Sequence, residues 1–220
     1  MKKICITLVL IVISLSLLGC NETESESNET ARVKSEENVN NQKAVEQKTK
    51  VGLPDGYGKF TYPNGDVYEG EWKDYLPNGH GKALYANGIE YEGEWKVGRE
   101  NGQGKNIYPN GDTYEGSFEN GKRSGYGKYI CANGDVYEGE WKNGEKDGYG
   151  KYIWTRGDVY EGEWKNGEKN GKGKYTGANG DTYEGEFKNG NRNGYGKYKF
   201  ANGRVKSGIW QNGKLIQKDN

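Results

Sequence analysis

Aromatic and polar residues alternate along most of this chain, in short runs that glycines separate. In the segment Asp-Val-Tyr-Glu-Gly-Glu-Trp that ends at Trp72, Tyr68 and Gly70 fall on the same side of an extended strand as Trp72. The acidic residues between them, Glu69 and Glu71, fall on the other side, because successive side chains of a strand point to opposite faces. The pattern predicts β-strands with one aromatic face and one polar face.

The same segment returns at a period of 23 residues, which indicates a repeat architecture. Copies of Tyr-Glu-Gly begin at Tyr68, Tyr91, Tyr114, Tyr137, Tyr160 and Tyr183. A seventh, altered copy, Lys-Ser-Gly, begins at Lys206, as expected for a terminal repeat whose outer side meets solvent. Nothing after residue 54 has helical periodicity, so we expect an all-β fold of seven repeats over residues 54–220.

Each repeat has two places for a glycine-containing turn, and these turn signals predict a β-hairpin. A three-residue loop at 63–65 would place Phe60 opposite Tyr68, whereas a two-residue loop would pair Tyr68 with Thr61. We favour the three-residue loop because it aligns aromatic residues with each other. Seven repeats then form up to fourteen strands. The second turn signal is missing at 74–77, where we expect an irregular junction.

Stacked hairpins predict one elongated, twisted antiparallel sheet with a groove on one side and a ladder of Tyr and Trp along one face. The chain is 31% hydrophobic and contains 37 glycines, too little aliphatic material for a conventional core. The aromatic face must therefore be covered by curling, by self-association or by a bound molecule. The 32 basic and 32 acidic residues cancel, which argues against nucleic-acid binding.

The start of the chain predicts an export signal at residues 1–19. A basic Met-Lys-Lys precedes a mostly apolar run at residues 4–18, and Gly19 and Cys20 follow. The ending Leu-Leu-Gly-Cys resembles the lipobox of bacterial lipoproteins, which implies that Cys20 is lipidated and becomes the mature N-terminus. The alternative is an ordinary signal peptide or an uncleaved anchor. The resemblance implies a palmitate-type anchor in a membrane of the cell envelope.

Residues 20–53 predict a flexible polar tether between this anchor and the repeats. The segment is rich in Asn, Glu, Ser, Thr and Lys and contains no aromatic residue. Such a composition cannot bury enough apolar surface to offset the entropy of ordering. We therefore expect the tether to hold the repeats clear of the lipid headgroups.

The units Gly-x-Gly-Lys, Pro-Asn-Gly-Asp, Tyr-Glu-Gly-Glu-Trp and Asn-Gly resemble the MORN repeat (membrane occupation and recognition nexus). The resemblance implies tandem β-hairpins in an elongated sheet, used for membrane-lipid contact, protein binding or dimerisation. The chain departs from the pattern at Ile89, which replaces Asp, and at Phe118 and Phe187, which replace Trp.

No group of residues forms a catalytic or metal-binding pattern, so we expect neither an enzyme nor a cofactor. His80 occupies a slot that varies between repeats, and the glutamates recur with the repeat, whereas a catalytic pair would be unique. Cys131 takes a position that tyrosines hold elsewhere, which indicates a small buried hydrophobe. Local function is expected where the repeats differ, at His80, Cys131, Trp154 and residues 74–77.

The candidate binding residues are aromatic residues beyond those that the repeat requires. Tyr126, Tyr149, Trp154 and Tyr195 are expected to line the groove and contact a peptide or a sugar, and packing within the sheet is the alternative role. With the predicted anchor at Cys20, they favour a lipid-anchored, exported scaffold that binds another protein without catalysis. Cell-wall glycan binding and direct phospholipid binding by the repeats are the alternatives, and the neutral charge counts against the second.

Overall fold

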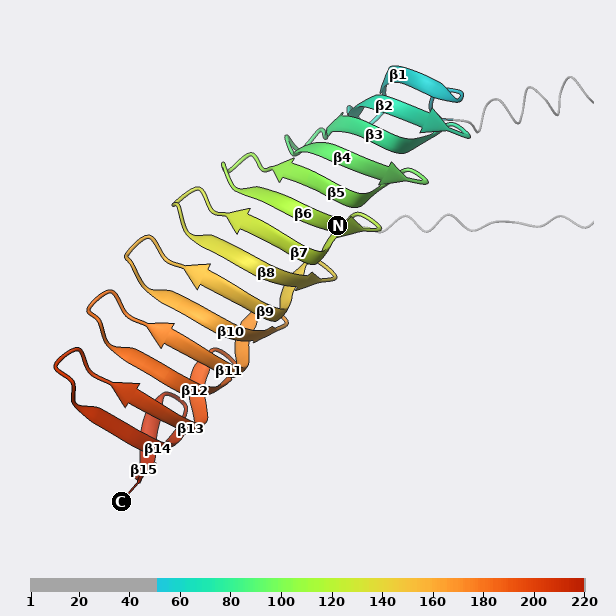
Figure 1. Ribbon diagram of the computed structural model, residues 1–220. Helices are drawn as coiled ribbons and strands as arrows, with labels where there is room; N and C mark the ends of the chain where they lie inside the picture. Colours follow the sequence, from blue (N-terminus) through green and yellow to red (C-terminus); the bar gives the residue numbers. More distant parts are fainter. Residues whose placement is uncertain (1–50, 220) are drawn as a thin grey trace, which may run out of the picture. The chain divides into compact units, whose positions relative to one another are not determined.

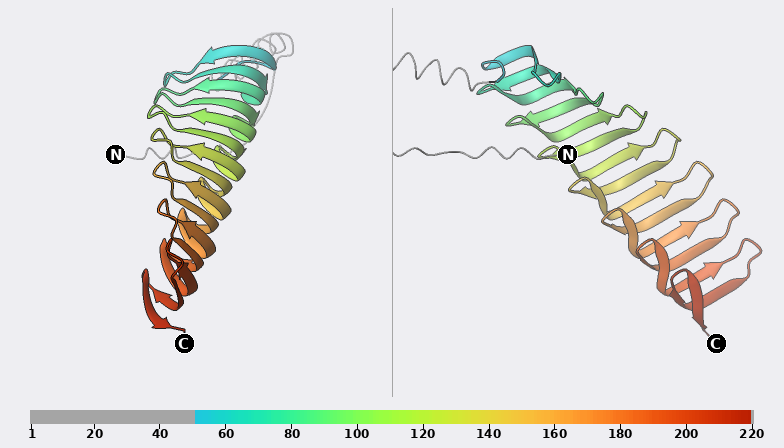
Figure 2. Two further views of the ribbon diagram at one scale, coloured as in Figure 1. Left: turned by 60° about the vertical axis from the view of Figure 1, so that its left-hand side comes forward. Right: turned by 180° about the vertical axis from the view of Figure 1, so that it is seen from behind.

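The computed structural model describes residues 51–219, which form a single open antiparallel sheet of fifteen strands (Figure 1). The strands are β1 (Gly56–Thr61), β2 (Val67–Lys73), β3 (Leu76–Leu84), β4 (Glu90–Lys96), β5 (Arg99–Ile107), β6 (Thr113–Glu119), β7 (Lys122–Ile130), β8 (Val136–Lys142), β9 (Glu145–Ile153), β10 (Val159–Lys165), β11 (Glu168–Thr176), β12 (Thr182–Lys188), β13 (Asn191–Lys199), β14 (Val205–Gln211) and β15 (Lys214–Lys218). Each strand pairs with its neighbours in the sequence. The sheet twists along its length (Figure 2), so the predicted all-β single sheet is confirmed.

The predicted signal peptide (1–19), Cys20 and all but the last residues of the predicted tether (20–53) lie outside the described residues. Leu53, at the end of that tether, packs against the aromatic core of the sheet. The described range 51–219 contains no helix that could cross a membrane.

The first turn of each repeat is the three-residue loop that aromatic pairing favours. Phe60 pairs with Tyr68 across β1 and β2, and Tyr152 pairs with Tyr160 across β9 and β10. In the first loop, the N–H of Gly65 donates to the carbonyl three residues before it at 2.9 Å. Gly65 has a φ of +92°, which a residue with a Cβ adopts only with strain. The predicted register is confirmed.

The second turn is a two-residue loop in which both residues have positive φ, as a type I′ hairpin requires. Asn143 and Gly144 are typical, with φ of +53° and +90°. Asp74 and Tyr75 form the same turn, with φ of +51° and +65°. The predicted irregular junction at 74–77 is therefore wrong. The turn forms without Asn-Gly because the paired strands on both sides hold its backbone in the left-handed conformation.

The last repeat ends with an additional strand. Asn212 and Gly213 form a further type I′ turn, with φ of +48° and +81°, and β15 then pairs with β14. Leu215 of β15 packs against the core. The predicted maximum of fourteen strands is one too few for the described chain, because the turn after Trp210 starts a fifteenth.

The core is a single layer of aromatic rings on one face of the sheet, which we call the aromatic face. Its fully buried side chains in the described repeats are Tyr68, Tyr91, Tyr114, Tyr137, Tyr160 and Tyr183. The ring of Tyr68 meets Trp72 of its own strand edge-on, with 5.0 Å between centroids, and Trp95 of the next repeat at 4.9 Å. Its hydroxyl donates to the carbonyl of Glu71 at 2.9 Å. Each ring thus links two repeats, and neighbouring rings bury it without a second sheet.

At five of the six junctions between the described repeats, an aspartate after the first turn connects one repeat to the next. Asp66 accepts a hydrogen bond from the N–H of Ala86 at 2.8 Å. The same bond joins Asp112 to Ala132, Asp135 to Thr155, Asp158 to Ala178 and Asp181 to Ala201. Donation from the Thr155 N–H is the main reason why the pKa of the Asp135 carboxyl is lowered. The loops are therefore tied together along one edge of the sheet.

The second repeat lacks this aspartate, and the third lacks the donor. Ile89 stands where the aspartate belongs, and the residue that would donate to it is Pro109, which has no N–H. Pro63 holds the same loop position in the first repeat. No aspartate occupies the corresponding earlier position in the chain, so this proline costs no such hydrogen bond. The aspartate and its donor are thus present together or absent together, and the departure at Ile89 has a structural reason.

Restoring both partners at this junction is expected to stabilise it. In a double-mutant cycle, Ile89→Asp and Pro109→Ala should show a favourable coupling of about 1 kcal/mol, the usual net worth of one hydrogen bond. Ile89→Asp alone should bring no gain, because its carboxylate would face a proline. Urea denaturation of the four proteins measures the coupling. Pro63→Ala is the control, and a coupling of Ile89→Asp to Pro63→Ala as large as to Pro109→Ala would contradict the explanation.

Candidate binding surfaces

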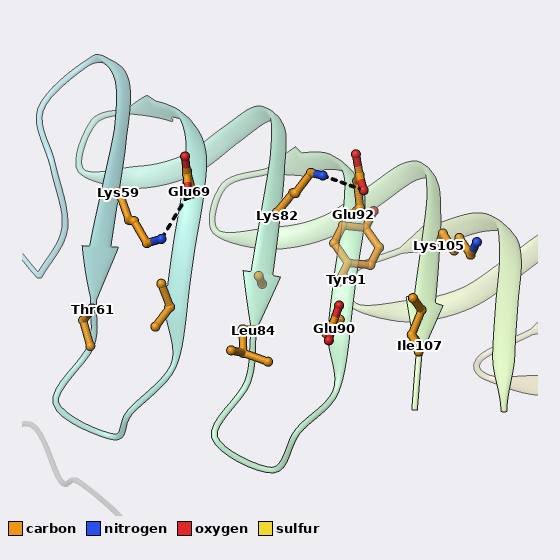
Figure 3. Close-up of a pocket in the computed structure, with 12 residues that line it drawn as sticks. Lys59, Thr61, Glu69, Lys82, Leu84, Glu90, Tyr91, Glu92, Lys105 and Ile107 are labelled. Atoms are coloured by element: carbon orange, nitrogen blue, oxygen red, sulfur yellow. Dashed lines mark ion pairs between the residues drawn. The ribbon is translucent and has the colours of Figure 1, made fainter. Parts of the chain in front are cut away.

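The face opposite the aromatic rings, which we call the charged face, carries a row of alternating lysines and glutamates. Lys59 lies 3.2 Å from Glu69, and Lys82 lies 3.0 Å from Glu92 (Figure 3). The row contains Lys59, Glu69, Lys82, Glu92, Lys105, Glu115, Lys128, Glu138, Lys151, Glu161, Lys174, Glu184 and Lys197. Exposed pairs of this kind stabilise a fold little. Because the signs alternate from strand to strand, the row presents no field of a single sign.

A row of partly exposed aliphatic side chains runs beside the lysines and glutamates. Leu84, Ile107, Ile130 and Ile153 are between 38% and 49% exposed. Near β1 to β5, Thr61, Leu84 and Ile107 line one side of a shallow hollow of about 490 Å³, and charged residues of the neighbouring row line the other (Figure 3). Glu90 lies between Leu84 and Ile107 and interrupts this row. Exposed apolar groups that gather in this way are typical of an interaction surface.

Exposed tyrosines form a third row on the charged face. Their exposed fractions are 74% for Tyr57, 60% for Tyr126, 53% for Tyr149 and 53% for Tyr195. The hydroxyl of Tyr126 donates to Glu138 of the adjacent strand at 3.1 Å. Three of the four predicted groove residues therefore share this face.

The fourth predicted groove residue, Trp154, lies on the aromatic face. Its ring centroid is 4.5 Å from that of Tyr152 and 6.2 Å from that of Tyr175. The structure thus does not bring the four residues into one groove. Strand alternation already predicts this separation of Trp154 from the tyrosines. Gly127 pairs with Gly139 on the aromatic face, so Tyr126, the residue before it, points to the charged face.

The glutamates before the Trp or Phe have a role that the sequence analysis missed. The pairing of β2 with β3 shifts between Gly70 and Trp72, which forms a β-bulge. At this bulge the N–H of His80 donates to Glu71 at 3.0 Å. The same bond recurs from Gln103 to Glu94, Tyr149 to Glu140, Lys172 to Glu163 and Tyr195 to Glu186. His80 therefore serves here through its backbone, and its side chain is exposed. The recurrence of these glutamates in successive repeats was the sequence signal that could have predicted this role.

Within residues 51–219, half-buried cations lie over the rings of the aromatic face, and sequence reasoning missed them as well. They are Arg123, Lys146, Lys169 and Arg192. The Arg123 Cζ is 4.3 Å from the centroid of Trp141, and the Lys146 Nζ is 4.5 Å from that of Trp164. Burial lowers the pKa of Lys146 and of Lys169, because desolvation disfavours the charged form. Cation–π contacts offset part of that cost.

Cys131 has no environment that would activate its thiol. The side chain is half-buried, and burial raises the pKa of the thiol, the opposite of what a reactive cysteine needs. In the described part of the chain, no three His, Cys, Asp or Glu residues lie close enough to hold a metal ion.

Comparison with known proteins gives a clear match to one repeat family. The family model described as MORN repeat matches residues 52–67, 68–90, 91–113, 114–136, 137–159, 160–182 and 183–203. Among solved structures, the chain is similar to the TCP domain of SAS-4 (dCPAP) of Drosophila melanogaster in complex with a proline-rich motif of Ana2 (dSTIL), at 17% identity over 71% of this chain and 86% of that chain, with a TM-score of 0.44. It is also similar to a mutant TCP10 domain of Danio rerio CPAP, at 14% identity over 77% and 97% of the two chains, with a TM-score of 0.31. No curated protein matches.

Proposed function

This chain belongs to the MORN-repeat family, and from that premise we propose that it is a scaffold that binds a partner protein along its charged face. The observation that carries the proposal is the row of exposed aliphatic side chains that runs beside the lysines and glutamates. The apolar row supplies area to bury, and the alternating charges supply local hydrogen-bonding partners that select among proteins. Repeat scaffolds of this kind are typically non-catalytic, and we propose no reaction.

We further propose that the protein is exported and held on a membrane of the cell envelope through lipid at Cys20. The support is the lipobox-like sequence, with its basic start and apolar run. Two or more acyl chains bind a membrane stably, at about 0.8 kcal/mol for each buried methylene. Residues 20–53 would then be the tether between the lipid and the repeats.

Cys20→Ser is expected to move the protein from the membrane fraction to the soluble fraction and to abolish incorporation of labelled palmitate. The reason is that Cys20 would be the acylated residue, and serine offers no thiol. Cys131→Ser is the matched control and should leave both readouts unchanged. If Cys20→Ser still sedimented with membranes as the natural protein does, the proposed anchor would be rejected.

Cross-linking in living cells tests the protein-binding proposal. A photoreactive amino acid at Tyr126 or Tyr149 should capture a discrete protein, whereas the same group at Trp154, on the opposite face, should not. Ile130→Lys with Ile153→Lys should reduce the adduct at least tenfold without changing the melting temperature, because both side chains are surface-exposed. Adducts with lipid or glycan alone, or no adduct from either tyrosine position, would count against a protein partner.

A further inference from the structure

The third repeat breaks the pattern of cations on the aromatic face. Glu100 stands at the position that Arg123, Lys146, Lys169 and Arg192 hold in the later repeats. It is only 8% exposed. A buried carboxylate thus occupies the position at which the following repeats place their own positive charge.

A second replacement leaves space beside this carboxylate. Asn106 stands where the later repeats carry Tyr129, Tyr152, Tyr175 and Tyr198. The smaller amide leaves the place of a phenol ring open. The result is a hollow of about 440 Å³, and Glu100 and Asn106 line it together with Tyr85, Trp95 and Tyr108.

One buried acceptor of the hollow, the Oδ1 of Asn106, has no hydrogen-bonding partner among residues 51–219. In residues 51–219, the one hydrogen bond to the Glu100 carboxylate comes from the hydroxyl of Tyr85 at 2.7 Å. Asn106 is 7% exposed, and its Oδ1 is buried and accepts no hydrogen bond from the described residues. Burial raises the pKa of the Glu100 carboxyl, because desolvation disfavours the charged form. Buried acceptors left unpaired in this way cost free energy.

We propose that this hollow, which lies on the aromatic face, binds a lysine or arginine side chain of a protein segment that docks on this face, separately from the contact proposed along the charged face. The cation would donate to Glu100 and to the Oδ1 of Asn106, and it would lie against the rings of Trp95 and Tyr108. The chain itself shows that tryptophan rings of the aromatic face accept either cation, since Arg123 lies over Trp141 and Lys146 over Trp164. The origin of the side chain in a partner rests on the proposed scaffold function, whereas the chemistry of the hollow does not.

A second hollow adjoins the first and extends the expected recognition. It has a volume of about 550 Å³ and shares Tyr85 and Trp95 with the first. Apolar side chains line much of it, among them Leu76, Pro77 and Ala83. We therefore expect an apolar residue close to the basic residue in the segment of the partner that binds here.

Titration of the full-length, ¹⁵N-labelled protein with N-acetyl-lysine methylamide tests the proposal through the indole N–H signal of Trp95. A saturable shift is expected, and none with N-acetyl-norleucine methylamide at the same ionic strength. Glu100→Gln should weaken binding at least tenfold, because the charge is lost. Glu100→Arg should abolish it, because the protein's own guanidinium would occupy the hollow. Glu145→Gln, an exposed glutamate at the start of β9 and outside the proposed binding rows, is the matched control and should bind as the natural protein does.

Two results would overturn the proposal: a lysine probe that binds no better than the norleucine probe, or one that binds Glu100→Arg as tightly as the natural protein. Should Glu100→Gln fail to fold, Glu100→Arg still decides, because it carries the residue type that the next repeat uses. Probe binding without a cross-linked partner would keep this site and reject the scaffold. A cross-linked partner without probe binding would reject this site alone.

Discussion

Replacing Gly150 with alanine is expected to lower the free energy of unfolding by about 3 kcal/mol, at the upper end of the usual cost of overpacking. A Cβ at this position would lie 2.6 Å from the Cζ and 2.7 Å from the Cε2 of Tyr137. That ring cannot move aside, because it is buried and meets Trp141 and Trp164 edge-on, at 5.2 Å and 5.3 Å between centroids. Urea denaturation followed by tryptophan fluorescence measures the loss.

Gly58→Ala is the matched control for this prediction. Gly58 holds the same place in the first repeat, but a Cβ there would meet only the flexible end of the Leu53 side chain. Neither glycine has a positive φ, so alanine brings no backbone strain at either site. We expect Gly58→Ala to cost less than about 1 kcal/mol. In a Tyr137→Ala background the cost of Gly150→Ala should largely disappear, and equal costs with and without the ring would contradict the close-approach argument.

Tyr160→Ala is expected to destabilise the array by about 3–5 kcal/mol, the range for removal of a large buried aromatic side chain. The Tyr160 ring is fully buried and packs edge-on against Trp164 at 5.2 Å and Phe187 at 5.0 Å between centroids. Its hydroxyl donates to the carbonyl of Glu163 at 3.0 Å. Removing the ring therefore breaks the contact between two repeats as well as the packing within one. Chemical denaturation monitored by circular dichroism measures the effect.

Two further variants separate the parts of this effect. Tyr160→Phe retains the ring and should cost about 1 kcal/mol, because only the hydrogen bond is lost. Tyr149→Ala removes a tyrosine from the exposed row of the charged face and should cost less than about 0.5 kcal/mol. If Tyr149→Ala were as destabilising as Tyr160→Ala, the single layer of rings would not be the core of this sheet.

The exceptions among the repeats show where sequence reasoning reached its limit. The variable residues at His80 and Cys131 stood out in the sequence, yet the first contributes its backbone to a bulge and the second is a half-buried thiol with a raised pKa. A role for Glu100 and Asn106 was not predicted, because polar residues are expected to be exposed and only the structure shows that these two are buried. The available signal was their place in the repeat. Alignment of the repeats puts Glu100 where later repeats carry a cation and Asn106 where they carry a tyrosine, and strand alternation puts both on the aromatic face.

The sequence by itself determined the all-β fold, the pairing of Phe60 with Tyr68 and the burial of one tyrosine in each complete repeat. These features depend on local rules, since alternation assigns faces and turn residues set register. Only the tertiary structure decided which repeats leave the aromatic face open. That outcome depends on which side chains meet in the folded sheet. Glu100 and Asn106 of β5 leave a hollow only together with the rings of Tyr85 and Trp95 from the preceding repeat.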